Sequence, residues 1–343
     1  MVASPSASGA RLTLAVILGG LAALQLASVP LGHYYAGRIE GIAPGSVTYE
    51  QWRDYTAEAR APDILFVGDS RAFADVDEIQ LATLVGGRLG SSVRVGKFGV
   101  NGADAAVLEA LVYRVMSRPS RPRLIVYALA EFQFNANYGR DFTSDYWQIS
   151  DPPDLGYLDE AFRLDPDRGR LARGLLLPAI ANLPLITQGL ACDIGRIRPV
   201  PGCRFGGNQN PAAFRAEFKQ SYLRDFSYSD QQERYVSETV GRIRAGGAQV
   251  AFVVFPTDGI DSVDPPAYAM FQTRTRALAV REGAQMLDMH SDVPDQPGLW
   301  ADLLHLTKTG RSQITPKLAE FCFANYQPAA SQASFSAEPA RMA

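Results

Sequence analysis

The chain has 343 residues, of which 47% are hydrophobic and 20% charged. This apolar content excludes intrinsic disorder over most of the chain, and the length is enough to bury a large core, in one large domain or two small ones. The chain carries 33 Lys and Arg against 36 Asp and Glu, a net charge of −3. Nucleic-acid binding normally needs a basic excess, so we expect no nucleic-acid partner. Three cysteines are too few for a disulfide scaffold or a Cys-rich zinc site.

An uncharged apolar run near the N-terminus, Leu12–Val29, favours a membrane anchor. As a helix it would span about 27 Å, close to the hydrocarbon thickness of a bilayer. We expect a cytoplasmic N-terminus at 1–11 and a transmembrane anchor over 12–31, because Arg11 is the only charge before the run. A cleaved signal peptide and a buried core helix are the alternatives. With an anchor or a signal peptide, the globular part works outside the cytoplasm.

Three further segments follow the anchor. We expect a juxtamembrane connector with a short helix over 32–60, a folded domain over 61–328 and a disordered tail over 329–343. Within the domain, residues 133–230 are rich in Pro, Asp, Tyr and Phe, with one apolar helix near 171–190. We interpret this stretch as an insertion over one edge of the sheet. It would recognise a substrate or partner, or merely extend the packing.

The three cysteines fall in two settings. Cys192 and Cys203 lie in a loop-like, Pro-containing stretch and could form a disulfide in an oxidising compartment. Two unpaired thiols are the alternative. Cys322 lies in an apparently helical segment and is expected to be a small core residue.

Short apolar runs alternate with amphipathic segments through the domain. This pattern predicts an α/β fold, a three-layer sandwich with a parallel five-stranded sheet whose two faces are covered by helices. Ligands of such sheets bind at the carboxyl ends of the strands. We expect strands at 63–67, 93–99, 124–130, 250–255 and 285–289, and helices at 78–85, 103–117, 231–244, 268–282 and 309–326.

A serine follows the first expected strand in Gly68-Asp69-Ser70-Arg71. On a tight turn between strand and helix, its hydroxyl would be exposed and successive backbone N–H groups would point at the same spot. Ordinary turn chemistry is the alternative for Gly-Asp-Ser.

A carboxylate and an imidazole lie three residues apart, at Asp302 and His305, just before the last expected helix. A serine hydroxyl needs a base to act as a nucleophile at neutral pH, and a carboxylate holds the imidazole in the required tautomer. One turn can supply both groups. The alternatives are a helix N-terminal charge for Asp302 and a surface position for His305.

A glycine and an asparagine, Gly99 and Asn101, follow the second expected strand. Glycine permits close backbone approach, so its N–H can face a developing oxyanion, and the asparagine could add a side-chain donor. A plain Gly-Asn turn is the alternative.

Together these segments resemble the blocks of the SGNH/GDSL hydrolase superfamily. LFVGDSRAF is similar to its first block, FGVNGAD to its second and DLLHLTKTG to its last, over roughly 61–325 without the insertion. The resemblance implies an SGNH-like sheet and a catalytic triad of Ser70, Asp302 and His305. The oxyanion-binding groups would be Ser70, Gly99 and Asn101.

One block departs from this family pattern. Where the family has Gly-x-Asn-Asp after the third strand, this chain has Ala128-Leu129-Ala130-Glu131. The oxyanion asparagine therefore has no counterpart at Ala130. Either Asn101 or the backbone N–H groups of Ser70 and Gly99 would do its work, or activity is low. Two later asparagines, Asn135 and Asn137, could also substitute.

Two further residues bear on the site. His290 is the rival base, with a loop position as its alternative. Arg71, beside the serine, would steer an anionic substrate or form a salt bridge with a neighbouring carboxylate.

A Ser-His-Asp centre without a metal motif implies acyl transfer through a covalent acyl-enzyme, with no metal and no cofactor. Water as acceptor makes an esterase, and a sugar hydroxyl makes an acyltransferase. With an N-terminal anchor the chain resembles membrane-tethered proteins that O-acetylate exported polysaccharides beside a multi-span membrane-bound O-acyltransferase. That resemblance implies a single pass through the inner (cytoplasmic) membrane, a periplasmic or otherwise extracytoplasmic catalytic domain, and a glycan substrate. The alternatives are a catalytically silent SGNH scaffold that binds glycan or partner proteins in a polysaccharide secretion complex, and a lipase-like enzyme.

Overall fold

The computed structural model describes residues 46–100, 102–138, 211–258, 264–296 and 298–326, together with 16, 19–20, 22–28, 30–31 and 190. Backbone contacts divide the chain into two units, Met1–Gln51 with Asp141–Phe205 and Trp52–Arg140 with Gly206–Ala343. The second unit contains the sheet and all the described residues of the candidate site.

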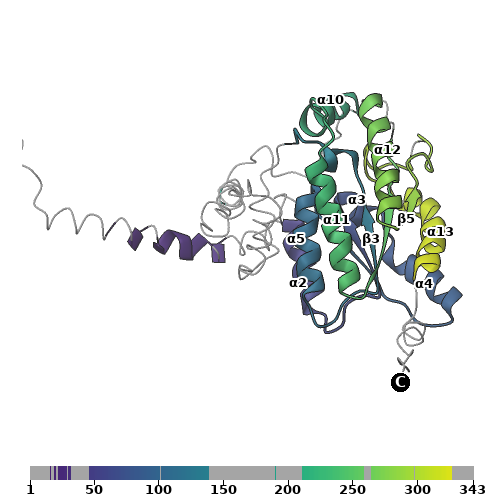
Figure 1. Cartoon of the computed structure of the whole chain (residues 1–343), viewed down its shortest axis with the longest axis horizontal. Coiled ribbons are helices and arrows are strands. Elements are labelled where there is room, and N and C mark those ends of the chain that lie inside the picture. Colours follow the sequence, from purple (N-terminus) through teal and green to yellow (C-terminus); the bar gives the residue numbers. More distant parts are fainter. Residues whose placement is uncertain are drawn as a thin grey trace, which may run out of the picture. The chain divides into compact units, whose positions relative to one another are not determined.

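Five parallel strands form one sheet in the order β2-β1-β3-β4-β5. Figure 1 labels β3 and β5 of this sheet among the helices that flank it. The α/β fold with a parallel five-stranded sheet is therefore confirmed. The chain steps from β1 to β2 on one side and then returns to place β3 on the other side of β1, so the strand order reverses between β1 and β3. Ligand sites of open parallel sheets lie at such a reversal. The strands are β1 Ile64–Gly68, β2 Val95–Gly99, β3 Leu124–Ala128, β4 Gln249–Val254 and β5 Gln285–Asp288.

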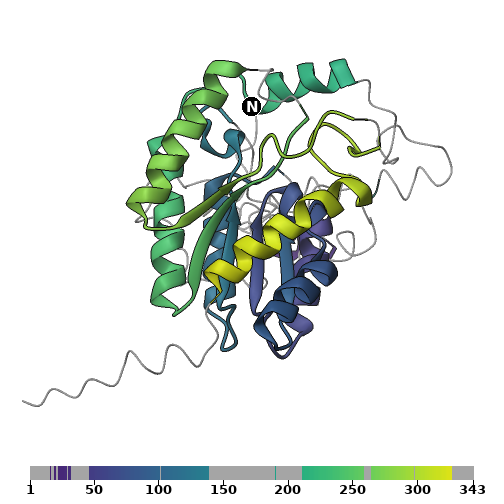
Figure 2. The ribbon, with the colours of Figure 1, turned by 90° about the vertical axis from the view of Figure 1, so that its right-hand side faces the viewer.

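Helices cover both faces of this sheet. One face packs against α5 and α11, and the other against α4 and α13, which cross the near side of the sheet in Figure 2. The helices are α2 Ser46–Ala57, α3 Ser70–Ala74, α4 Glu78–Leu89, α5 Ala105–Met116, the 3₁₀ helix η1 Glu131–Phe134, α10 Pro211–Tyr222, α11 Asp230–Ala245, α12 Pro265–Arg281 and α13 Lys308–Asn325.

Short polar side chains set where most of these helices begin. Each accepts a hydrogen bond from a backbone N–H of the first turn, which would otherwise have no partner within the helix. At the other end of α4, Gly90 adopts φ 65°, a left-handed conformation that glycine takes without strain. The N-terminal caps are Asp69, Asp77, Asp104, Ser229, Asp264 and Thr307.

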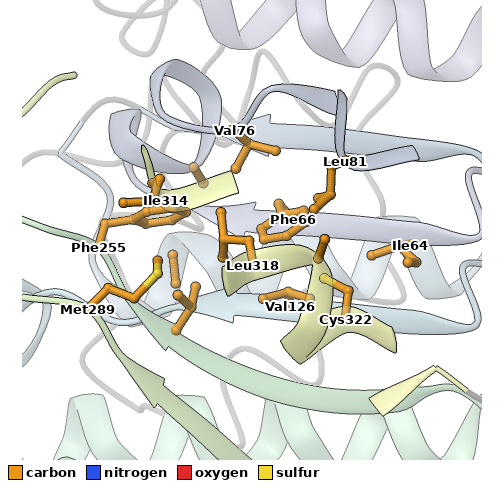
Figure 3. Close-up of a cluster of buried hydrophobic side chains, with 14 of the residues drawn as sticks. Ile64, Phe66, Val76, Leu81, Val126, Phe255, Met289, Ile314, Leu318 and Cys322 are labelled. Atoms are coloured by element: carbon orange, nitrogen blue, oxygen red, sulfur yellow. The ribbon is translucent and has the colours of Figure 1, made fainter. Parts of the chain in front are cut away.

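The core against α4 and α13 is built from alternate residues of the strands. Phe66 and Val126 point from β1 and β3 toward Leu318 and Cys322 of α13, and all four are fully buried (Figure 3). Cys322 is a free thiol in this core, as the sequence predicts. Burial raises its pKa, as expected for a packing residue rather than a reactive one.

Three described elements are not predicted by the sequence. The helices α3 and η1 span only five and four residues, too few to show a helical period. Helix α10 falls in the stretch interpreted as an insertion over 133–230. The two ends of that stretch meet in an antiparallel bridge between Asn135 and Tyr228.

Other predictions fall outside the described residues. These are the Cys192–Cys203 pairing, the tail over 329–343, the helix at 171–190 except for Leu190, and eight of the 20 positions of the anchor at 12–31. In the part of the chain that is described, no helix has both the length and the apolar composition needed to cross a bilayer. The anchor therefore stays a prediction.

We predict that Leu318→Ala lowers the free energy of unfolding by about 2–5 kcal/mol, because it leaves a cavity among fully buried side chains. Urea unfolding followed by circular dichroism measures the change. Val280→Ala on α12 is the control, since Val280 is 82% exposed and should shift the free energy by about 0.5 kcal/mol or less. Equal effects of the two substitutions would contradict this core assignment.

Candidate active site

Ser70 lies on the turn that joins β1 to α3. Strand β1 ends at Gly68, Asp69 caps α3 by accepting a hydrogen bond from the Arg71 N–H at 3.0 Å, and Ser70 is the first helical residue. No acceptor among the described residues pairs with the Ser70 backbone N–H. The turn therefore presents a half-buried hydroxyl and an unpaired N–H at the carboxyl end of a central strand.

Two glycines allow neighbouring strands to approach this turn closely. A Cβ on Gly68 would lie 2.4 Å from the Cβ of Ala128, and a Cβ on Gly99 would lie 2.6 Å from the Asp69 carbonyl oxygen. Neither contact is sterically possible, so a residue with a Cβ would clash at both positions and glycine is required there. The ends of β2 and β3 therefore lie directly against the turn that carries Ser70.

Asp302 and His305 lie on one tight turn before α13. Asp302 Oδ1 accepts the N–H groups of Leu304 at 2.8 Å and His305 at 2.9 Å. The Ala301 N–H donates to the His305 carbonyl at 2.8 Å, which closes the turn from the other side. Asp302 Oδ2 lies 2.8 Å from His305 Nδ1, so the same carboxylate shapes the turn and orients the ring.

The structure brings Ser70, Asp302 and His305 together. His305 Nε2 lies 2.8 Å from Ser70 Oγ, although 235 positions separate the two residues. A carboxylate can only accept a hydrogen bond, which places a proton on Nδ1 and leaves Nε2 to accept from the serine hydroxyl. This arrangement can remove a proton from Ser70 and return it to a leaving group.

The charges around His305 favour its protonated form. Burial disfavours the imidazolium, but the hydrogen bond with Asp302 and the negative charges of Asp302, Asp75 and Asp69 outweigh that effect and raise the pKa of His305 above its usual value. Burial likewise disfavours the Asp302 carboxylate. Its hydrogen bond with His305 and the two backbone N–H donors outweigh this, and the pKa of Asp302 is lowered. The pair is thus arranged to stabilise a proton on the imidazole.

Of the two roles expected for Arg71, the structure shows the salt bridge with neighbouring carboxylates. Its side chain is 1% exposed, and Nη2 lies 2.7 Å from Asp69 Oδ2 and 3.9 Å from Glu131 Oε2. The expected role in steering an anionic substrate is therefore corrected: the guanidinium holds two buried carboxylates together beneath the Ser70 turn.

The asparagines that could replace the missing oxyanion donor are differently placed. Asn101 lies outside the described residues. Asn135 is buried, and its amide donates to the carbonyls of Tyr222 and Arg224, while Asn137 donates to the carbonyl of Asp225. Both amides thus bond the segment after β3 to backbone carbonyls at and just beyond the end of α10.

His290 contacts a different part of the sheet edge from Ser70. Its Nδ1 lies 3.0 Å from Thr257 Oγ1, and its ring packs on Tyr268 with the centroids 4.1 Å apart. In the described residues the base in contact with Ser70 is therefore His305.

Sequence reasoning missed two buried carboxylates near the triad, Asp75 and Glu131. Glu131 follows β3 at the end of the altered block and faces Arg71. Asp75 ends α3 and accepts a hydrogen bond from the Leu306 N–H. No local pattern marks Asp75, because its partner is 231 positions away.

Comparison with known proteins finds only distant likenesses, all among solved structures. No family model matches the sequence, and no curated protein matches it. A crystal structure described as a "putative acylhydrolase" from Bacteroides fragilis aligns with a TM-score of 0.40 at 13% identity, over 81% of this chain and 96% of that chain. At this identity and TM-score the likeness assigns no function to this chain.

We predict that Asp302→Asn lowers the pKa of the His305 imidazole, because it removes the negative charge that stabilises the imidazolium. An NMR titration of the ring Cε1–Hε1 resonance measures the change, and the His305→Ala variant assigns the resonance. A pKa that stays the same in Asp302→Asn would mean that the two side chains are not coupled in solution.

Proposed function

We propose that this protein catalyses serine-dependent acyl transfer or hydrolysis of an O-acyl ester. The observation that supports it is the continuous contact from Asp302 through His305 to Ser70, with 2.8 Å at both steps. The turn with Ser70 lies at the carboxyl end of β1, next to the point where the strand order reverses.

In the proposed reaction, His305 Nε2 takes the proton from Ser70 Oγ as the oxygen attacks the ester carbonyl carbon. The tetrahedral intermediate expels the alcohol, which receives that proton, and an acyl-serine remains. Water or a sugar hydroxyl then gives its proton to Nε2 as it attacks the acyl-serine. The bond between the acyl carbon and Ser70 Oγ breaks, and Oγ takes the proton from Nε2, which regenerates Ser70. Asp302 stabilises the imidazolium in both halves of the reaction.

The oxyanion in this proposal is bound by the Ser70 N–H, with Gly99 and Asn101 as the further donors expected from the sequence. The Ser70 N–H supports this, because it lies beside the nucleophile without an acceptor among the described residues. Since one such donor is worth about 10²–10³ in rate, an enzyme without the family asparagine at Ala130 would depend strongly on these groups.

The proposed substrate is an uncharged acyl ester, O-acetyl in the first instance, on an exported or cell-envelope polysaccharide. The carboxylates Asp69, Asp75 and Asp302 lie around the serine and the base, and the nearby Arg71 is buried in its ion pair. An anionic acyl group would meet this negative field, whereas an acetyl ester would not. The glycan, the membrane-bound O-acyltransferase partner, the anchor over 12–31 and the extracytoplasmic location rest on the sequence resemblance.

We predict that a fluorophosphonate probe labels the full-length protein at Ser70 and that Ser70→Ala abolishes both labelling and hydrolysis of p-nitrophenyl acetate. Mass spectrometry of the labelled peptide locates the modified serine. Ser117→Ala is the matched control, since this exposed serine ends α5 and its hydroxyl donates to the Tyr113 carbonyl of the same helix.

If the wild-type protein shows neither labelling nor esterase activity, the enzyme hypothesis is eliminated and the catalytically silent scaffold is favoured. Labelling that persists in Ser70→Ala would place the nucleophile elsewhere. The O-acetyl content of the exported glycan in cells with Ser70→Ala tests the substrate separately. Unchanged acetylation would contradict the proposal that this glycan is the substrate, without contradicting the proposed acyl chemistry.

A further inference from the structure

Asp75 joins the helix that carries Ser70 to the turn that carries His305. It ends α3, where its N–H donates to the Arg71 carbonyl at 2.8 Å. Its Oδ1 accepts the Leu306 N–H, also at 2.8 Å, on the residue directly after His305. One fully buried side chain thus spans the two segments whose separation sets the distance between nucleophile and base.

A second contact runs in parallel with this one. Arg311 of α13 donates from Nη1 to the carbonyl of Ala74 at 3.0 Å. The end of α3 is therefore held to the start of α13 as well as to the turn before it. Movement of the His305 turn away from Ser70 would break the Asp75 contact first, since Leu306 lies between the base and α13.

We propose that Asp75 is a positioning residue that fixes His305 against Ser70 through its hydrogen bond to the Leu306 backbone. This inference rests on the proposed function. A hydrogen bond to an ionised carboxylate is stronger than one between neutral groups, so in its ionised form Asp75 holds the turn more firmly than a neutral acceptor would.

The surroundings of the second carboxyl oxygen support a functional role for Asp75. Asp75 Oδ2 is buried and has no hydrogen-bond partner among the described residues. Burial raises the pKa of Asp75 to about 7, while the Leu306 N–H and the positive charges of His305 and Arg71 act in the opposite direction and Asp69 adds to the increase. A buried carboxyl that is only half satisfied is costly for stability, and such groups are concentrated at functional sites.

The position of Asp75 also complements that of Asp302. The Asp302 side chain is 40% exposed, so water screens part of its charge, whereas Asp75 is fully buried. The negative charge of Asp75 therefore acts on His305 with little screening, in the direction that raises the pKa of the imidazole. Ionised Asp75 would support the imidazolium as well as hold its turn.

The test compares Asp75→Ala with Asp75→Asn in the full-length protein, with p-nitrophenyl acetate as substrate. Asp75→Ala removes the acceptor, and we expect kcat to fall about 10²-fold with KM nearly unchanged, because the base is misplaced. Asp75→Asn keeps an acceptor oxygen for the Leu306 N–H and should restore kcat to within about tenfold of wild type. In the Asp75→Asn variant, the acid limb of the pH profile of kcat should move to lower pH, because the negative charge that raises the His305 pKa is gone.

Asp77→Ala is the matched control. Asp77 lies two residues away and also accepts a backbone N–H, from Gln80, but it caps α4 at the surface. It should lower the melting temperature without changing kcat or the pH profile, so it reports the effect of losing a carboxylate–backbone bond alone.

Folded Asp75→Ala with wild-type kcat, or Asp75→Asn as slow as Asp75→Ala, would overturn the proposal. If Asp75→Ala does not fold, Asp75→Asn decides, and an unmoved acid limb overturns it. These outcomes are distinct from failure of the proposed function, which appears as unlabelled Ser70 or inactive wild-type protein.

Discussion

The 2.8 Å contact between Ser70 Oγ and His305 Nε2 is the interaction on which the rest of the site depends. Neither residue reaches the other through local structure. Ser70 is placed by β1, a central strand buried along its whole length, whereas His305 is on a turn beyond the last strand. The contact therefore exists only if that turn is held across the end of the sheet.

Backbone hydrogen bonds hold this turn on both of its sides. Trp300 and Leu306 form an antiparallel bridge, the Thr307 N–H donates to the Leu299 carbonyl, and Thr307 then caps α13. Gly310 packs so closely on Leu299 that a Cβ would lie 2.2 Å from its carbonyl oxygen. The turn thus continues directly into α13, whose Leu318 and Cys322 are anchored in the core, so packing of α13 supports the position of the turn.

The periodic parts of this fold could be predicted from the sequence, because burial imposes its pattern on them. β1, β3 and β4 are almost wholly buried and read as continuous apolar runs, and α11 and α13 show helical spacing. Ser70, Asp302 and His305 could be named from two short motifs, because each motif lies on a single turn. Asp75, Glu131 and the buried state of Arg71 could not, because their environments are created by segments distant in sequence.

The altered block after β3 shows how packing and chemistry compete for the same segment. Ala130 is 1% exposed and its N–H donates to Gln133 Oε1, while Glu131 turns inward toward Arg71. Phe132 packs in one cluster with Phe218 of α10 and with Leu304, the residue directly before His305. This segment therefore joins the region around α10 to the base turn instead of offering a side-chain donor to a reacting oxygen. In the proposed reaction, oxyanion stabilisation would then depend on the segments beside Ser70, namely its own turn and the end of β2, which the two glycine contacts hold in place.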